Sequence, residues 1–296
     1  MKSLEEGRLN GMTYEEMLKN AKTWMGPYCK ACPVCNGKAC TNQMPGPGAK
    51  GTGTVAVRNY DKWQEIRVNM DTICENRPVD TTLELFGRSF RYPIFAAPIG
   101  ALKLHYGDKY DDQAYNDILV SACADAGIAA FTGDGTNPDV MMAATNAIKA
   151  KDGQGIPTVK PWDINTLKEK LALIQASDSF AVAMDIDAAG LPFLQNLTPP
   201  AGSKSVEELT EIVKAAGHEM KIRVDGGSRS GVDIFKALAL GADGVLIGRP
   251  YVTAVYGGGA EGVEVYTKKL AAELLDTMAM CGAHSLAEIS RDMVRV

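Results

Sequence analysis

The sequence predicts an α/β protein, a TIM-type (β/α) barrel with about six recognisable strands instead of eight. Short apolar or β-branched runs alternate with helical stretches from about Ile66 onward, which is typical of a parallel sheet covered by helices. The runs end in small or polar residues, which favours a barrel whose carboxyl-terminal face carries the site. The 40 residues from Asp185 to Asp225 leave no room for two further strands beside one loop and one helix.

The elements follow from hydrophobic periodicity and from the Gly, Pro and Asp residues that bound each run. Strands are predicted at 92–100, 127–135, 155–162, 180–187, 220–227 and 244–250. Helices are predicted at 111–126, 138–151, 164–177, 205–216, 230–240 and from Glu264 to Met280. The glycine run 257–259 is interpreted as a loop near the site.

Composition divides the chain near residue 55. The segment before it combines a short helix-like stretch, a cysteine cluster and the sequence MPGPGAKGTG, whose prolines and glycines cannot continue a helix or a strand. We therefore predict an N-terminal helical and cysteine-rich segment at 1–55 and a barrel at 56–296.

Charge and hydropathy exclude several classes of protein. The 36 acidic and 31 basic residues give a formal charge of −5, which argues against a nucleic-acid partner or a polybasic membrane patch. No apolar run approaches the roughly 18 to 20 residues needed for a membrane span, and the N-terminus has no signal-peptide core. We expect a cytoplasmic location, where seven cysteines do not form a disulfide framework.

Residues 221–250 contain the most specific pattern, a phosphate cradle. Glycines after two successive strands let backbone N–H groups approach an anion, two arginines supply charge, and an aspartate at a strand end can bind a polyol. The alternative is that these glycines only make tight turns. The residues are Asp225, Gly226, Gly227, Arg229, Gly248 and Arg249.

The stretch from Lys221 through YVTAVYGGGAEGV to CGAHSLAEI resembles the C-terminal third of the FMN-dependent 2-hydroxy-acid oxidoreductases, the glycolate and lactate oxidase group. FAAPIGA at 95–101 is similar to the family's first-strand motif. The resemblance implies an FMN-binding barrel that oxidises a small 2-hydroxy acid by hydride transfer to the flavin. Besides the cradle, it implies FMN contacts at Ala97, Pro98, Ile99, Thr132, Gly133 and Thr158.

The family's catalytic base, in an SNHGGR-type motif, and its flavin-stabilising lysine have no counterpart, because SVEELTEIVKAAGHEM leads directly to KIRVDGG. Of the three histidines, His218 and His284 are expected to be structural or at the surface, and only His105 lies near the predicted active face. Lys160 and Asp185 end the third and fourth strands. They form either an acid–base pair or only a buried ion pair.

A second pattern is the spacing C-x2-C-x2-C-x4-C, which resembles a ferredoxin-like iron–sulfur loop more than a zinc ribbon. Zinc, redox thiols or no ligand are the alternatives. An iron–sulfur cluster near a flavin would favour a dehydrogenase with an electron-acceptor protein over an oxidase. Tyr28 is a candidate to contact the flavin. The four residues are Cys29, Cys32, Cys35 and Cys40.

Three functions stay open from the sequence. The first is oxidation of a 2-hydroxy acid such as lactate or glycolate, impaired or not by the missing segment. The second is a catalytically inactive flavin-binding or phosphate-ligand-binding barrel. The third is an enzyme like the flavin-dependent isopentenyl-diphosphate isomerases. The open edges of a gapped barrel also predict a homo-oligomer.

Overall fold

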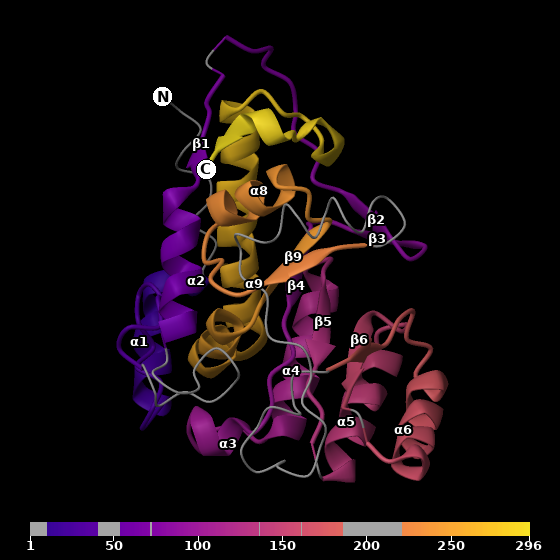
Figure 1. The fold of residues 1–296 in the computed structure, drawn as a ribbon. Helices are drawn as coiled ribbons and strands as arrows, with labels where there is room; N and C mark the ends of the chain where they lie inside the picture. Colours follow the sequence, from indigo (N-terminus) through magenta and orange to yellow (C-terminus); the bar gives the residue numbers. More distant parts are fainter. Residues whose placement is uncertain (1–10, 41–53, 72, 136, 161, 186–220) are drawn as a thin grey trace.

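The computed structural model describes residues 11–40, 54–71, 73–135, 137–160, 162–185 and 221–296. Its centre is a six-stranded parallel sheet, which confirms the predicted strands (Figure 1). The predicted helix 205–216 lies outside the described residues. The strands are β4 (Ile94–Ala96), β5 (Ala129–Thr132), β6 (Gly155–Val159), β7 (Ala183–Met184), β8 (Arg223–Asp225) and β9 (Gly244–Ile247).

The order of the sheet is β7-β6-β5-β4-β9-β8. Strands β4 to β7 step outward in one direction, and β9 and β8 continue on the other side of β4. The two edge strands, β7 and β8, are therefore the ones that flank residues 186–220 in the chain. Among the described residues the sheet therefore has both of its edges at this point of the sequence, as the predicted gapped barrel requires.

Both faces of the sheet are apolar, as in parallel sheets covered on both sides. Phe95, Phe131 and Ile156 belong to an inner cluster, whereas Ala96 and Ala130 join the larger core on the helix side. The hairpin of β2 (Leu83–Leu85) and β3 (Arg88–Phe90) adds to the inner cluster, with the Phe90 and Phe95 rings 5.3 Å apart.

The helices that cover the sheet begin at capped positions. Asp111, Asn137, Asp163 and Ser230 each accept a backbone N–H in the first turn of the helix that follows. On the outer side, α5 and α6 lie against β6 (Figure 1). These helices are α4 (Asp112–Asp125), α5 (Pro138–Lys149), α6 (Ile164–Ala176) and α8 (Gly231–Ala239).

The final helix differs from the prediction. Helix α9 (Arg249–Met280) begins 15 residues before the expected start at Glu264 and has a kink at Gly259, where φ is 57° and ψ is −134°. The predicted loop at 257–259 is reduced to this kink between two helical segments, because Gly257 lies within the first of them. A Cβ on Gly257 would lie 2.2 Å from the Met17 carbonyl oxygen, so this glycine allows close helix packing.

The partner in that packing is α1 (Tyr14–Trp24), which lies beside α9 (Figure 1). Its buried residues Met17 and Ala21 share one core with α9. Helix α2 (Thr54–Glu65) follows, and the division near residue 55 stays a prediction. The remaining elements are β1 (Arg67–Val68), which pairs with β10 (Val294–Arg295), α3 (Leu102–His105), and the short 3-10 helices Leu286–Glu288 and Arg291–Met293.

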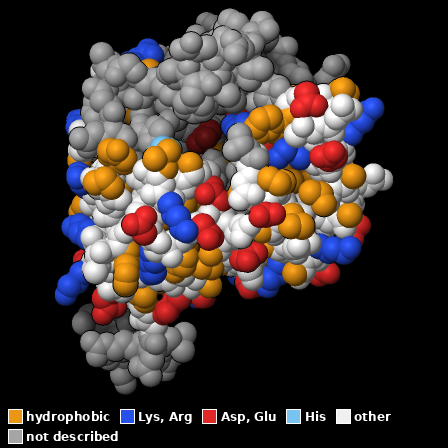
Figure 2. Space-filling view, turned by 90° about the horizontal axis from the view of Figure 1, so that it is seen from below, with side chains coloured by type: hydrophobic (Ala, Val, Ile, Leu, Met, Phe, Trp, Pro, Cys, Tyr) orange, Lys and Arg blue, Asp and Glu red, His pale blue; other side chains and the backbone are white. Residues whose placement is uncertain are grey.

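Acidic, basic and apolar side chains intermix on the face shown in Figure 2. Within the described ranges, no helix has both the length and the apolar character that crossing a bilayer requires.

Candidate active site

Several of the predicted site residues lie at the carboxyl ends of the strands, and strand geometry decides which of them face the inside of the barrel. Side chains alternate between the two faces of a strand, so Thr158 lies on the same face as Ile156 of the inner cluster. By the same rule Thr132 shares the helix side with Ala130. A contact of β5 with a ligand inside the barrel would therefore come from Gly133 or from backbone rather than from the Thr132 hydroxyl.

The turn after β8 has the conformation that the double glycine predicts. Gly226 has φ +105° and Gly227 has φ +83°, both in the region that favours glycine. Helix α2 lies directly on this turn, because a Cβ on Gly227 would be 2.4 Å from the Asn59 carbonyl oxygen. The buried Trp63 donates its indole N–H to the Gly226 carbonyl at 3.0 Å.

The turn after β9 converges with the turn after β4. A Cβ on Gly248 would lie 3.1 Å from Ile99 Cδ1 and 3.6 Å from Ala97 Cβ. A Cβ on Gly133 would lie 2.5 Å from the Ile99 carbonyl oxygen. The structure thus brings together three strand ends, including the Ala97-Pro98-Ile99 turn, that the sequence assigned separately to the flavin.

The two arginines of the cradle face residues 29–40, which we call the cysteine loop. Arg229 donates from Nε to the Cys35 carbonyl at 2.6 Å and from Nη1 to the Ser228 carbonyl at 2.5 Å. Burial lowers the pKa of Arg249, but electrostatic interactions with Cys35, Tyr106 and Cys40 and a hydrogen bond to Cys40 outweigh it, so the net shift of the pKa is upward. The cysteine loop therefore lies against the phosphate end of the site.

Asp225 ends β8 and is exposed to solvent. Desolvation by neighbouring protein nevertheless raises the pKa of its carboxyl above the ordinary value, while the Gly226 N–H and the charges of Arg229 and Arg249 act in the opposite direction.

The cysteine loop does not hold its thiols as a metal centre. In the described part of the chain, no group of three or more His, Cys, Asp or Glu residues is arranged to hold a metal ion. Burial raises the pKa of the Cys29 thiol to about 11 and also raises that of Cys32, with further contributions from the neighbouring thiols. The arrangement of the described residues thus gives no support to an iron–sulfur or zinc centre.

The strand ends nevertheless fit a phosphorylated, polyol-bearing cofactor such as FMN. The Thr158 hydroxyl and the Ser228 hydroxyl are buried and have no hydrogen-bond partner among the described residues. Buried polar groups are normally satisfied, so these two are available to a ligand. Together with the glycine turns and Arg229 and Arg249, they supply the donors that a phosphate and a ribityl chain need.

Lys160 and Asp185 form the predicted pair, with Lys160 Nζ 2.7 Å from Asp185 Oδ2. Their side chains are 22% and 27% exposed, so the pair is neither fully buried nor a free surface contact. A backbone bond from the Asp185 N–H to the Val159 carbonyl, at 2.8 Å, holds the ends of β6 and β7 together.

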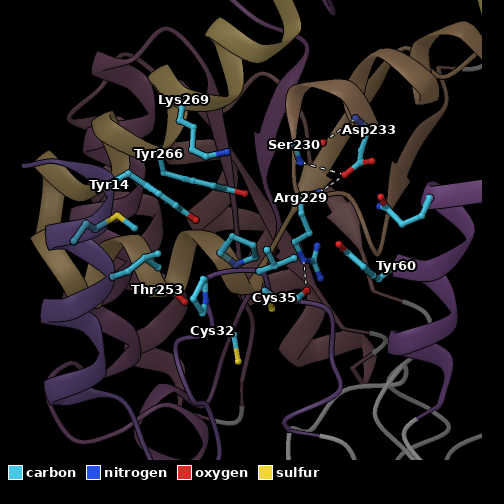
Figure 3. Close-up of a pocket in the computed structure, with 16 residues that line it drawn as sticks. Tyr14, Cys32, Cys35, Tyr60, Arg229, Ser230, Asp233, Thr253, Tyr266 and Lys269 are labelled. Carbon is cyan, nitrogen blue, oxygen red and sulfur yellow. Dashed lines mark hydrogen bonds between the residues drawn. The ribbon is translucent and has the colours of Figure 1, made fainter. Parts of the chain in front are cut away.

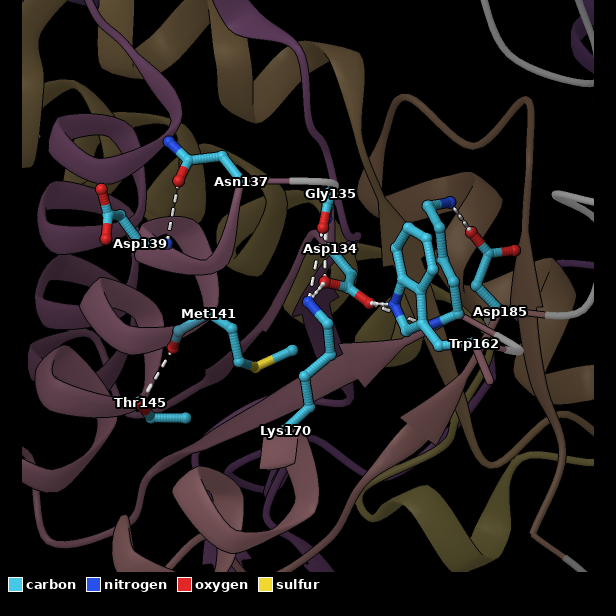
Figure 4. Close-up of polar contacts among 10 residues, drawn as sticks. Asp134, Gly135, Asn137, Asp139, Met141, Thr145, Trp162, Lys170 and Asp185 are labelled. Carbon is cyan, nitrogen blue, oxygen red and sulfur yellow. Dashed lines mark hydrogen bonds and ion pairs between the residues drawn. The ribbon is translucent and has the colours of Figure 1, made fainter. Parts of the chain in front are cut away.

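Sequence reasoning missed Asp134, which follows β5 and lies next to this pair (Figure 4). Its side chain is 1% exposed and is bonded by Lys160, Trp162 and Lys170. The signal that could have found it is an aspartate directly after a buried strand, the same signal that identified Asp185 and Asp225.

The structure describes two of the three histidines, His105 and His284. His284 is 7% exposed, with Nε2 2.7 Å from the Glu75 carbonyl and Nδ1 near Arg77, which is a structural position. His105 ends α3 and packs against Tyr106, and His218 lies outside the described residues. Tyr28 is 37% exposed.

A cavity of about 340 Å³ lies between α1, the cysteine loop and the first turns of α8 and α9 (Figure 3). Tyr14, Cys32, Arg229, Tyr266 and Lys269 are among the side chains around it. It adjoins the phosphate end of the site through Arg229, so we treat it as part of that region.

A parallel α/β sheet with glycine turns and paired arginines at adjoining strand ends defines an α/β barrel of the phosphate-cofactor-binding class. A family model described as FMN-dependent dehydrogenase matches residues 47–192 and 201–296. The chain belongs to this family, and FMN is the cofactor that membership supports.

Curated relatives match a part of the chain. The chain is 48% identical over 87 residues to glycolate oxidase 1 of Zea mays and 46% identical over 90 residues to glycolate oxidase of Spinacia oleracea. These matches cover 29% and 30% of this chain, and the chain covers 24% of the length of each relative.

Solved structures show the same fold. A mandelate oxidase variant with 2-hydroxy-phenylacetamide superposes with a TM-score of 0.69 at 20% identity, covering 96% of this chain and 97% of that one. The flavin-binding domain of baker's yeast flavocytochrome b2 gives a TM-score of 0.65 at 18% identity, covering 80% and 77%. The chain thus has the fold of these flavoenzymes, with a six-stranded sheet in its described residues.

Proposed function

We propose that the protein is an FMN-dependent oxidoreductase that acts on the CH–OH group of a small 2-hydroxy acid. The observation that carries the proposal is the convergence of the β4, β5 and β9 turns, with Arg229 and Arg249 at the phosphate end, in a chain of the FMN-dependent dehydrogenase family. The names of the similar proteins, glycolate oxidase and mandelate oxidase, point to the substrate class.

Two groups of residues would bind two different parts of the cofactor. The turns at Gly226-Gly227 and Gly248, with the two arginines, would bind the phosphate, and the Ala97-Pro98-Ile99 turn and Thr158 would lie along the flavin ring. When bound, FMN supplies a hydride acceptor for the substrate α-carbon.

Lys160 and Asp185 are the candidate catalytic pair. An Asp185 carboxylate oxygen is the proposed acceptor of the substrate hydroxyl proton, and the Lys160 ammonium, 2.7 Å away, would stabilise negative charge on the substrate. Neither the family's histidine nor its lysine has a counterpart in the sequence, so we expect slow turnover relative to a complete site.

Anaerobic mixing of the FMN-loaded protein with glycolate, lactate and mandelate tests the proposal. Bleaching of the flavin absorption by at least one of these acids is the expected result. A protein that binds FMN but is not bleached by any of them would instead be the inactive flavin-binding barrel.

The proposal also covers the electron acceptor, the oligomeric state and the cellular location. An acceptor protein and an iron–sulfur or zinc centre on the cysteine loop stay predictions, tested by metal and acid-labile sulfide content. A homo-oligomer would cover the β7 and β8 edges, and its test is the mass in solution. The cytoplasmic location likewise stays a prediction.

A further inference from the structure

Asp134 is the most heavily engaged carboxylate near the candidate pair. Its side chain is 1% exposed at the carboxyl end of β5. Oδ2 accepts the Lys160 backbone N–H at 3.0 Å and the Trp162 indole N–H at 2.6 Å. Oδ1 accepts the Lys170 ammonium at 2.7 Å and the Gly135 N–H at 2.8 Å. A single carboxylate therefore connects β5, the residues after β6, and helix α6.

The contact with Lys160 is to its backbone, not to its side chain. The Lys160 ammonium is directed instead to Asp185, the residue after β7, with Nζ 2.7 Å from Oδ2. Figure 4 shows Asp134 and Asp185 on either side of Trp162. The bond to Asp134 fixes the Lys160 peptide relative to β5, and with it the point from which the Lys160 side chain extends. The bond from Trp162 restrains the backbone two residues further on. Asp134 thus holds the backbone from which the Lys160 side chain extends toward Asp185.

The two lysine ammonium groups pair with different carboxylates. Lys170 from α6, with a side chain 9% exposed, neutralises Asp134, and its ammonium also lies 5.2 Å from the centre of the Trp162 ring. Asp134 is therefore already paired, and the Lys160 ammonium is left to Asp185. The Asp134–Lys170 and Lys160–Asp185 ion pairs thus lie next to one another, linked by the Lys160 peptide N–H. The Trp162 indole adds a second hydrogen bond to Asp134.

We propose that Asp134, held by Lys170, is a positioning residue that orients Lys160 toward Asp185 and toward the substrate. This inference rests on the proposed function only for its catalytic consequence. The positioning itself is a property of the protein with or without FMN.

The test compares Asp134→Asn with Asp139→Asn, a matched control that removes an exposed carboxylate on the first turn of α5. The first readout is competitive acetylation of lysines with acetic anhydride, measured by peptide mass spectrometry on the protein with and without FMN. Lys268, 70% exposed, is the internal reference. We expect the relative reactivity of Lys160 to rise by about threefold or more in Asp134→Asn, because its ion pair loosens, and to stay unchanged in Asp139→Asn.

The second readout is the rate of flavin reduction by the best 2-hydroxy acid and its pH profile. We expect Asp134→Asn to lower the rate by about tenfold or more at unchanged FMN content, since small misplacements of a reacting group are costly. If Asp134→Asn does not fold, the double variant Asp134→Asn/Lys170→Met removes both charges of the buried pair, and the same rise in Lys160 reactivity is expected.

Unchanged Lys160 reactivity in the folded variant would overturn the inference, whatever the turnover. Failure of the proposed function has a different signature, which is no flavin reduction in the unaltered protein. The acetylation comparison then still decides whether Asp134 positions Lys160.

Discussion

Replacing Gly227 by alanine tests the phosphate turn directly. The residue has φ +83°, and a Cβ there would lie 2.4 Å from the Asn59 carbonyl oxygen and 2.5 Å from the Asn59 carbonyl carbon. The left-handed backbone costs a non-glycine residue about 1–2 kcal/mol. Forcing the backbone of α2 away adds about 1–3 kcal/mol of overpacking. The free energy of unfolding should therefore fall by about 2–5 kcal/mol.

The matched control is Gly87→Ala, in the β2–β3 hairpin. Gly87 has φ +74°, but a Cβ there would meet nothing within 4 Å. This variant carries the backbone cost of about 1–2 kcal/mol without the clash. The difference between the two variants thus isolates the contact with α2.

The assay is urea unfolding of both variants without cofactor, followed by FMN titration of the folded protein. Gly227→Ala should be the less stable variant and should bind FMN at least about tenfold more weakly, because its turn is displaced. Equal stability of the two alanine variants would refute the reasoning that α2 closes on this turn.

Four further substitutions and one measurement of metal and sulfide content follow from the same structure. Lys160→Met and Asp185→Asn should each slow flavin reduction by about 100-fold or more at unchanged FMN content, and an unchanged rate in both would remove the pair from the mechanism. Trp63→Phe removes the indole bond to the Gly226 carbonyl, so unfolding should become easier by about 1 kcal/mol, and a stability equal to the unaltered protein would count against that bond. Asp225→Asn should stabilise the protein without cofactor at pH 7, since the raised pKa means that the charged carboxyl is disfavoured in the folded state. That advantage should shrink as the pH falls through the raised pKa toward the ordinary value of about 3.9, and urea titrations at several pH values would show whether it does. If the cysteine loop rearranges into a metal site, protein purified without oxygen should contain iron with acid-labile sulfide, or zinc. Absence of iron, sulfide and zinc would refute the prediction of a metal centre.

Local patterns predicted the parts of the fold and site that depend on local chemistry. Strands bounded by Gly, Pro and Asp were found because periodicity and turn residues act over a few positions. The double-glycine turn and the meeting of Lys160 with Asp185 followed from strand ends, since adjacent parallel strands end at the same edge.

Contacts between distant segments were not predictable in this way. Trp63 and Gly226 are 163 residues apart in the chain, and Arg229 and Cys35 are 194 apart. Nothing in the local sequence of α2 indicates that it covers the phosphate turn. The start of α9 at Arg249 was not predicted because its glycines are typical of a loop. Gly257 instead allows α9 to pack closely against α1.

The measurement that tests the central claim most directly is the visible absorption of the FMN-loaded protein during anaerobic mixing with a 2-hydroxy acid. The account predicts that FMN binds, and that at least one acid among glycolate, lactate and mandelate bleaches its absorption. A protein that does not bind FMN at concentrations that saturate another member of the family, or whose bound FMN is bleached by none of the three acids, would contradict it.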